Sequence, residues 1–129
     1  MQAIRGAITA AADRPEEIRK AVEKLMEQII SANQIRTKNI VSVIFSSTAD
    51  IKSIYPARAF REMGYDSIPI FSCQEPEISG SLDLCIRVLV HLEQKNQEDI
   101  QETQGKVRHI YLEGARKLRP DLVEESLDG

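Results

Sequence analysis

Long apolar runs are absent from the sequence. The most apolar stretch is interrupted by Arg87 and His91, so nothing approaches the roughly 20 apolar residues of a membrane-spanning helix. The first residues, Met-Gln-Ala-Ile-Arg, lack the apolar run of a signal peptide. Cysteine is scarce as well. Cys73 and Cys85 could in principle form one disulfide, but no other feature is typical of a secreted chain. We therefore expect a soluble cytoplasmic protein with free thiols.

The chain also lacks an excess of charge of either sign. Seventeen Lys and Arg against twenty Asp and Glu give a formal net charge of -3, which provides no overall field for nucleic acid or an anionic membrane. Hydrophobic residues at 42% and charged residues at 29% are typical of a folded domain. A length of 129 residues suits one domain. We predict a single domain over residues 1–129, ending in a C-terminal tail at 119–129, with neither nucleic acid nor membrane as partner.

Familiar catalytic motifs are missing too. There is no phosphate-binding glycine loop, no dinucleotide fingerprint and no paired-cysteine zinc spacing. His91 and His109 have no closely spaced ligand partner, so a metal site would have to be assembled through space, and structural or surface roles are favoured. Cys73 is interpreted as a small buried residue rather than as a nucleophile. We expect no metal and no cofactor.

The apolar periodicity predicts two helices. In the first, from Pro15 to Asn33, the apolar positions share one face, and Asp13 with Glu16 predicts a capping box at its start. Those apolar positions are Ile18, Val22, Leu25 and Ile29. A second, shorter helix covers residues 56–63 and is ended by Gly64.

Five segments are predicted to be strands, namely 2–10, 40–46, 68–72, 82–92 and 107–112. The nearly continuous β-branched run at 40–46 indicates a strand buried on both faces. Alternation favours a strand at 82–92, although a helix stays open at its beginning. The polar segment 93–106 is predicted to be a solvated loop. The result is a mixed α/β single domain, with one β-sheet and flanking helices.

Arg87 is the most informative single residue. It interrupts an apolar strand, where an unpaired charge is costly. An ion pair with Glu75 and an anionic ligand explain it about equally well. Arg5 adds weight to a ligand, because it lies in a predicted strand beside Gly6, and glycine lets a ligand approach the backbone.

Several separate motifs of the chain resemble the barrel-class monofunctional chorismate mutases, in matching order and similar spacing. These motifs are Ile4-Arg5-Gly6-Ala7, Tyr55-Pro56-Ala57-Arg58-Ala59-Phe60-Arg61-Glu62, Pro69 to Glu75, Cys85-Ile86-Arg87-Val88 and Arg108-His109-Ile110-Tyr111-Leu112-Glu113. The likeness continues to Leu118-Arg119-Pro120-Asp121-Leu122 and so covers most of the chain.

The resemblance implies a fold, an assembly and a reaction. The assembly is a homotrimer with a barrel-like core of β-sheets, outer helices and active sites between subunits. The reaction is the intramolecular, Claisen-type rearrangement of chorismate to prephenate in phenylalanine and tyrosine biosynthesis, without nucleophile, metal or cofactor. Such a step requires a compactly held substrate and stabilisation of the charge that grows on the ether oxygen. Arginines provide both.

The resemblance also implies the roles of four catalytic residues. Arg87 meets the ether oxygen and a nearby carboxylate, and Arg5 binds a carboxylate. Glu75 accepts a hydrogen bond from the ring hydroxyl, and Tyr111 donates a further one. The alternatives are an ordinary strand aromatic for Tyr111 and a simple ion-pair partner of Arg87 for Glu75.

Eight further residues are implied to bind the substrate or line its pocket, with Arg58 and Arg61 at the pocket mouth. The other six are Tyr55, Ala57, Phe71, Ser72, Leu118 and Arg119. The alternative for Arg61 is a solvated helix residue. Counted back from Gln74-Glu75, Ser72 stands where the family has a cysteine, and its hydroxyl still offers a donor.

Two other functions compete with the mutase. A trimeric imine deaminase of the small barrel type also uses an arginine to hold a carboxylate between subunits, but the motifs at 85–87 and 108–113 favour the mutase. A non-catalytic trimer that binds a carboxylate ligand is the second alternative, since Ser72 departs from the family pattern.

Overall fold

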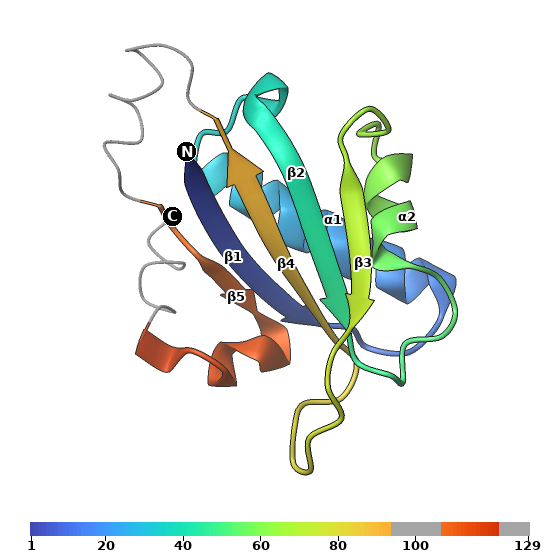
Figure 1. The fold of residues 1–129 in the computed structure, drawn as a ribbon. Coiled ribbons are helices and arrows are strands. Elements are labelled where there is room, and N and C mark those ends of the chain that lie inside the picture. Colours follow the sequence, from blue (N-terminus) through green and yellow to red (C-terminus); the bar gives the residue numbers. More distant parts are fainter. Residues whose placement is uncertain (94–106, 122–129) are drawn as a thin grey trace.

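The computed structural model describes residues 1–93 and 107–121, so the predicted loop at 93–106, apart from residue 93, and most of the tail at 119–129 lie outside the described residues. The described part forms one five-stranded sheet in the order β3-β2-β4-β1-β5 (Figure 1). The elements are β1 (Gln2–Thr9), α1 (Pro15–Ala32), η1 (Thr37–Asn39), β2 (Ile40–Ser47), α2 (Pro56–Glu62), β3 (Ile70–Gln74), β4 (Cys85–Leu92), β5 (Ile110–Leu112) and η2 (Glu113–Lys117), where η denotes a 3-10 helix. The predicted order of strands and α-helices is confirmed.

The sheet is mixed. The central strand β4 runs antiparallel to β1 and β2, whereas the edge strands β3 and β5 run parallel to β2 and β1. Helix α1 crosses behind the sheet in Figure 1, and α2 lies beside β3. The Phe60 ring of α2 packs against Phe45 of β2 with ring centroids 5.7 Å apart. Both helices therefore pack on one face of the sheet.

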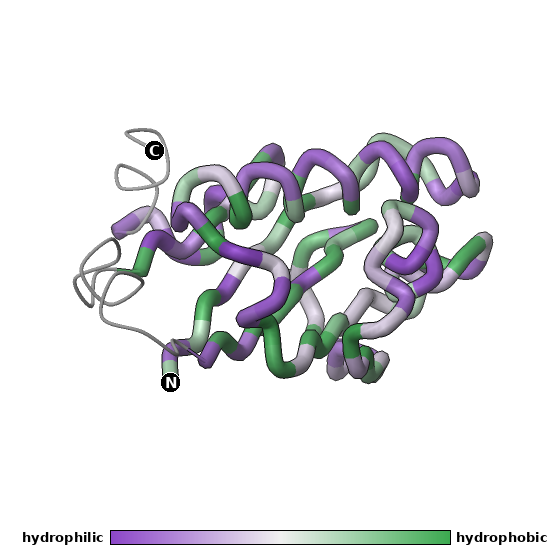
Figure 2. The backbone as a smooth tube through the Cα atoms, turned by 90° about the horizontal axis from the view of Figure 1, so that it is seen from above, coloured by the Kyte–Doolittle hydropathy of each residue, from purple (hydrophilic) through white to green (hydrophobic). Residues whose placement is uncertain are grey.

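The hydrophobic core lies between this face and the helices. All four predicted apolar positions of α1 are fully buried there, which confirms the predicted face. Polar residues follow the outer side of the helix, as Figure 2 shows. A Cβ on Gly6 would lie 2.7 Å from Ile29 Cδ1 and 3.2 Å from Leu25 Cδ1. The interpretation that Gly6 admits a ligand is therefore wrong, because helix α1 occupies that side.

The predicted capping box of α1 is also wrong. Arg14 is the N-cap, and no side chain caps the helix. Asp13 Oδ1 instead accepts the backbone N–H groups of Lys52 and Ser53, at 3.0 and 2.9 Å. These bonds, that of Lys52 first, hold the pKa of Asp13 below its usual value. Asp13 thus ties the start of α1 to the loop that precedes α2.

Within the single protomer, strand β2 is buried on one face only, contrary to the prediction. Val43 and Phe45 are buried on the helix side, whereas Val41 is 41% exposed and Ile44 is half-buried. The reason is that both α-helices pack on the same side of the sheet. We call the opposite side, which carries Arg5, Ile44, Ser46, Phe71, Cys73, Arg87 and Leu89, the open face.

The open face is partly covered at its β5 end. There Ala7, Tyr111 and Ala115 of η2 form a small buried cluster, with Leu82 and Leu118 packed against it. Over β4, β2 and β3, no helix of the described residues covers the face. No helix in this part of the chain is long and apolar enough to cross a membrane.

Candidate active site

One row of paired residues crosses the whole sheet on the open face. From β5 to β3, the register pairs Tyr111 with Ala7, Ala7 with Arg87, Arg87 with Ser46, and Ser46 with Cys73. Tyr111 and Arg87 thus point to the same side, two strand spacings or about 10 Å apart. The sheet therefore places two predicted catalytic residues, 24 positions apart in sequence, on one surface.

Glu75 lies beside Arg87 at the end of β3. Arg87 Nε is 3.1 Å from Glu75 Oε1, and the Ser46 hydroxyl donates to the same carboxylate oxygen. The backbone N–H of Glu75 donates to Ser47 O at 2.9 Å. Glu75 is therefore held by neighbouring strands, at the strand-to-loop junction that the sequence predicts.

Arg87 is not buried in the described chain. Its side chain is 46% exposed and that of Glu75 is 19% exposed. Contrary to the prediction, Arg87 does not place a charge in a buried part of the strand, because alternate residues of β4 point to the open face. The ion pair with Glu75, one of the two explanations, is present.

Sequence reasoning missed Ser46 as part of this arrangement. Its only signal in the sequence is weak. Ser42, Ile44 and Ser46 are two positions apart and so share one face of β2, which the two serines make less apolar than the other face. The family motifs do not include it.

A second group of predicted residues lies around β1, β5 and η2. Arg5 is exposed, and its backbone N–H donates to His109 Nδ1 at 3.0 Å. Tyr111 is 5% exposed within the small buried cluster. Arg119 binds Asp121 through two hydrogen bonds, Nε to Oδ1 at 3.1 Å and Nη2 to Oδ2 at 2.8 Å. The hydrogen bonds from Arg119 are the main cause that holds the pKa of Asp121 below its usual value, and the charge of Arg5 contributes more weakly. Both guanidinium groups therefore act on this one carboxylate.

A third group lines a cavity of about 660 Å³ at the ends of β2 and β3. Tyr55, Arg58, Ser72 and Cys73 are among its lining residues. Tyr55 is 70% exposed at the start of α2. This cavity, beside the edge strand β3, brings together three of the predicted substrate-binding residues, namely Tyr55, Arg58 and Ser72.

The remaining predicted pocket residues do not line this cavity. Ala57 is 4% exposed and packs in the hydrophobic core. Arg61 is exposed on α2, and Phe71 is 67% exposed on the open face of β3. The described chain therefore does not enclose all predicted residues in one pocket.

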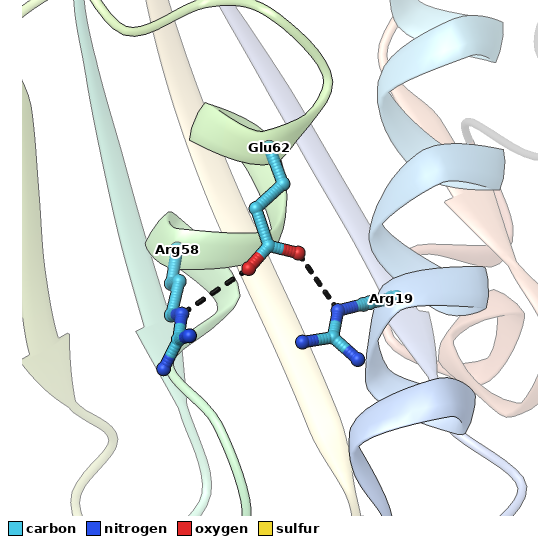
Figure 3. A network of polar contacts seen from close by, with 3 residues as sticks. All are labelled: Arg19, Arg58 and Glu62. Atoms are coloured by element: carbon cyan, nitrogen blue, oxygen red, sulfur yellow. Dashed lines mark hydrogen bonds and ion pairs between the residues drawn. The ribbon is translucent and has the colours of Figure 1, made fainter.

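Arg58 takes part in a polar network between the helices, shown in Figure 3. Glu62 accepts from Arg19 of α1 at 2.8 Å and from Arg58 at 3.1 Å. These bonds, that of Arg19 first, hold the pKa of Glu62 below its usual value. Because all three side chains are well exposed, the network contributes little stability. It links α1 to α2 beside the cavity that Arg58 lines.

The cysteines and histidines of the described residues are not grouped as in a metal site. Cys85 is buried, and burial raises the pKa of its thiol. Cys73 is exposed, so its interpretation as a buried residue is wrong. His91 Nδ1 lies 3.2 Å from the hydroxyl of Ser42. Within residues 1–93 and 107–121, no group of three His, Cys, Asp or Glu residues is placed to hold a metal ion.

Ser72 and Cys73 point to opposite sides of β3. Ser72 pairs in register with the buried Phe45 and Cys73 with Ser46. The thiol therefore shares the open face with Arg87, and the hydroxyl does not. Counting back from Glu75 identifies Ser72 as the family position, but it does not identify the side chain that faces Arg87.

The fold defines the class of protein. The structure matches a solved chorismate mutase from Clostridium thermocellum with a TM-score of 0.78 and 34% sequence identity, over 91% of this chain and 99% of that one. The class is therefore that of the small α/β chorismate mutases.

The sequence identifies the particular family. The model of "Chorismate mutase type I" matches residues 1–122. Chorismate mutase AroH of Bacillus subtilis (strain 168) is 37% identical over 123 residues, 95% of this chain and 92% of that protein. Chorismate mutase AroH of Thermus thermophilus is 39% identical over 123 residues, 95% of this chain and 96% of that protein. The chain belongs to the type I chorismate mutase family, which confirms the resemblance and does not favour the imine deaminase.

Proposed function

We propose that the protein catalyses the rearrangement of chorismate to prephenate on its open face, with Arg87 as the principal catalytic residue. The observation that carries this proposal is the Arg87–Glu75 pair, with a 3.1 Å contact at an accessible position of the sheet. Family membership supplies the reaction, and the pair supplies a cation and an acceptor side by side.

Each catalytic residue has a separate task. Arg87 meets the negative charge that develops on the ether oxygen as its bond breaks, an interaction stronger in the transition state than in the bound substrate. Glu75 accepts a hydrogen bond from the ring hydroxyl. Arg5 binds a carboxylate, and Tyr111 donates its hydroxyl. None of these residues transfers a proton, because the substrate rearranges within itself.

The complete site requires a neighbouring subunit in this proposal. The Arg87 group and the Tyr55 group lie at different parts of one protomer, and the open face leaves Phe71 67% exposed. In a homotrimer, the open faces form the barrel-like core, and the pocket residues of one subunit complete the site of the next. These residues are Tyr55, Arg58, Arg61, Phe71 and Ser72, with Leu118 and Arg119 closing the other side. The side chain of Ala57 packs in the core, so Ala57 can contribute to this wall only through its backbone.

The proposal includes a cellular setting. The substrate is the dianion chorismate, and the reaction belongs to aromatic amino acid biosynthesis in the cytoplasm. We expect neither metal nor cofactor, because the intramolecular rearrangement requires none. We expect neither nucleic acid nor membrane as a partner, because the net charge is only -3.

The test is the conversion of chorismate to prephenate by the purified protein and its Arg87 variants. Arg87→Ala removes the transition-state contact, so kcat should fall at least about 10²–10³-fold, as for loss of an oxyanion donor. Arg87→Lys retains charge but not the planar fork and should recover only part of the rate. Arg14→Ala is the control, because Arg14 is a surface residue beside Glu16 at the start of α1.

Two results would contradict the proposal. One is a wild-type protein that binds chorismate without converting it, which would favour the non-catalytic trimer. The other is an Arg87→Ala variant that folds, assembles and keeps a near-normal kcat.

A further inference from the structure

We infer that Ser46 is a positioning residue for the Arg87–Glu75 pair, an inference that rests on the proposed role of that pair. Ser46 lies on the open face of β2, between Arg87 of β4 and Cys73 of β3 in the register. Its hydroxyl donates to Glu75 Oε1, the same oxygen that lies 3.1 Å from Arg87 Nε. One carboxylate oxygen thus joins three adjacent strands.

The surroundings of Ser46 make this contact well defined. Its backbone lies in an interior strand, paired on both sides. A serine side chain has a single rotatable bond to its hydroxyl and loses little entropy when it is held. Glu75 has a longer side chain, 19% exposed at the beginning of a loop. The rigid partner therefore fixes the flexible one.

The position of Glu75 in turn governs where the Arg87 guanidinium lies. Hydrogen bonds to a charged group are stronger than neutral ones and more sensitive to alignment. With Ser46 in place, the carboxylate is shared between the hydroxyl and Arg87. Without the hydroxyl, Arg87 becomes the dominant partner of Oε1 and is drawn toward Glu75, away from the ether oxygen. The loss should appear mainly in kcat, because that contact is made in the transition state.

The test compares Ser46→Ala with Ser42→Ala in steady-state kinetics. Ser42 is on the same face of the same strand, is half-buried and also contacts a side chain, His91 at 3.2 Å. We expect Ser46→Ala to lower kcat about tenfold, the size of one hydrogen bond to a charged group, with KM within about twofold. Ser42→Ala should match the wild type, and Ser46→Thr, which keeps the hydroxyl, should recover most of the rate.

A double-mutant cycle separates positioning from a general effect on the fold. If Ser46 acts through Glu75, Ser46→Ala should change kcat by less than about twofold in a Glu75→Ala background. Independent, multiplying effects would overturn the inference, as would equal kcat values for Ser46→Ala and Ser42→Ala. If Ser46→Ala does not fold, Ser46→Cys retains the size with only a weak donor and must show the same fall in kcat. Failure of the proposed function is distinguishable, because then either the wild type would not convert chorismate or Arg87→Ala itself would keep its kcat.

Discussion

The Arg87 guanidinium already has a carboxylate partner in the protomer, since Glu75 Oε1 lies 3.1 Å from Nε. A substrate that leaves this contact in place therefore shares the guanidinium with Glu75. Arginine suits this, because its planar group carries five N–H donors in a fixed fork. The remaining donors can meet a carboxylate and the ether oxygen while the contact to Glu75 persists. A lysine at this position would offer one point of charge to both partners.

A prediction at the residue scale compares Glu75 with Ser72. Glu75→Ala removes a charged acceptor that also orients Arg87, so kcat/KM should fall by roughly 10²-fold or more, as for loss of a charged hydrogen-bonding partner. Ser72→Ala removes one neutral hydroxyl from the rim of the neighbouring cavity, and should cost less than about tenfold. Steady-state kinetics with chorismate measure both. The reverse order would mean that the family alignment between Ser72 and Glu75 is wrong.

Among the elements, the close packing of helix α1 on strand β1 requires that position 6 has no side chain. A Cβ there would lie 2.7 Å from Ile29 Cδ1 and 3.2 Å from both Leu25 Cδ1 and Val88 Cγ1. The neighbouring side chains are buried, so they have little room to move. The strand and the helix can therefore approach closely only with glycine at this position.

Gly6→Ala should accordingly destabilise the protein. Overpacking costs about 1–3 kcal/mol, which exceeds the gain of about 0.4–1 kcal/mol from a less flexible unfolded chain. Urea unfolding at a fixed protein concentration should show a lower midpoint with an unchanged slope. Ile29→Val removes Cδ1, the atom in closest contact, so it should recover part of the loss in the double variant. Additive losses would show that the contact is not the cause.

The sequence predicts best those elements that depend on a local pattern of apolar and polar residues. Helix α1 follows from apolar residues at the helical period, and its predicted face is buried. The role of Asp13 was not predictable in the same way and was wrongly interpreted as part of a capping box, because Asp13 binds Lys52 and Ser53, almost forty residues away. The prediction that β2 is buried on both faces is wrong for a similar reason, because the sequence of one strand does not determine on which faces of the sheet helices pack.

The candidate site shows the same division. Arg5, Glu75, Arg87 and Tyr111 are predictable because they stand in family motifs. Ser46 is not, because its contact with Glu75 depends on the register of β2 with β3 and β4. The opposite directions of Ser72 and Cys73 depend on that register as well.

At the scale of the whole molecule, the sheet is asymmetric. One face is covered by α1 and α2, whereas the open face carries Ile44, Leu89 and the 67% exposed Phe71 in one register row with Arg5. Sheets with one apolar face normally bury it against another layer. A second subunit provides such a layer, and it also brings the Tyr55 cavity of one chain toward the Arg87 of another in our proposal.

Light scattering should give a mass three times the 14.5 kDa of the chain, because the open faces pack together in the proposed trimer. Ile44→Asp places a charge between the apolar neighbours Leu89 and Phe71, and an unpaired buried charge is strongly unfavourable. The variant should dissociate into monomers and lose activity, since neither group of site residues is then completed. Ile78→Asp is the control, because Ile78 is 65% exposed in the loop between β3 and β4, outside the strands of the sheet. It should remain trimeric and active. A wild-type protein that is strictly monomeric and fully active would rule the assembly out, because the site of each chain would then be complete on its own.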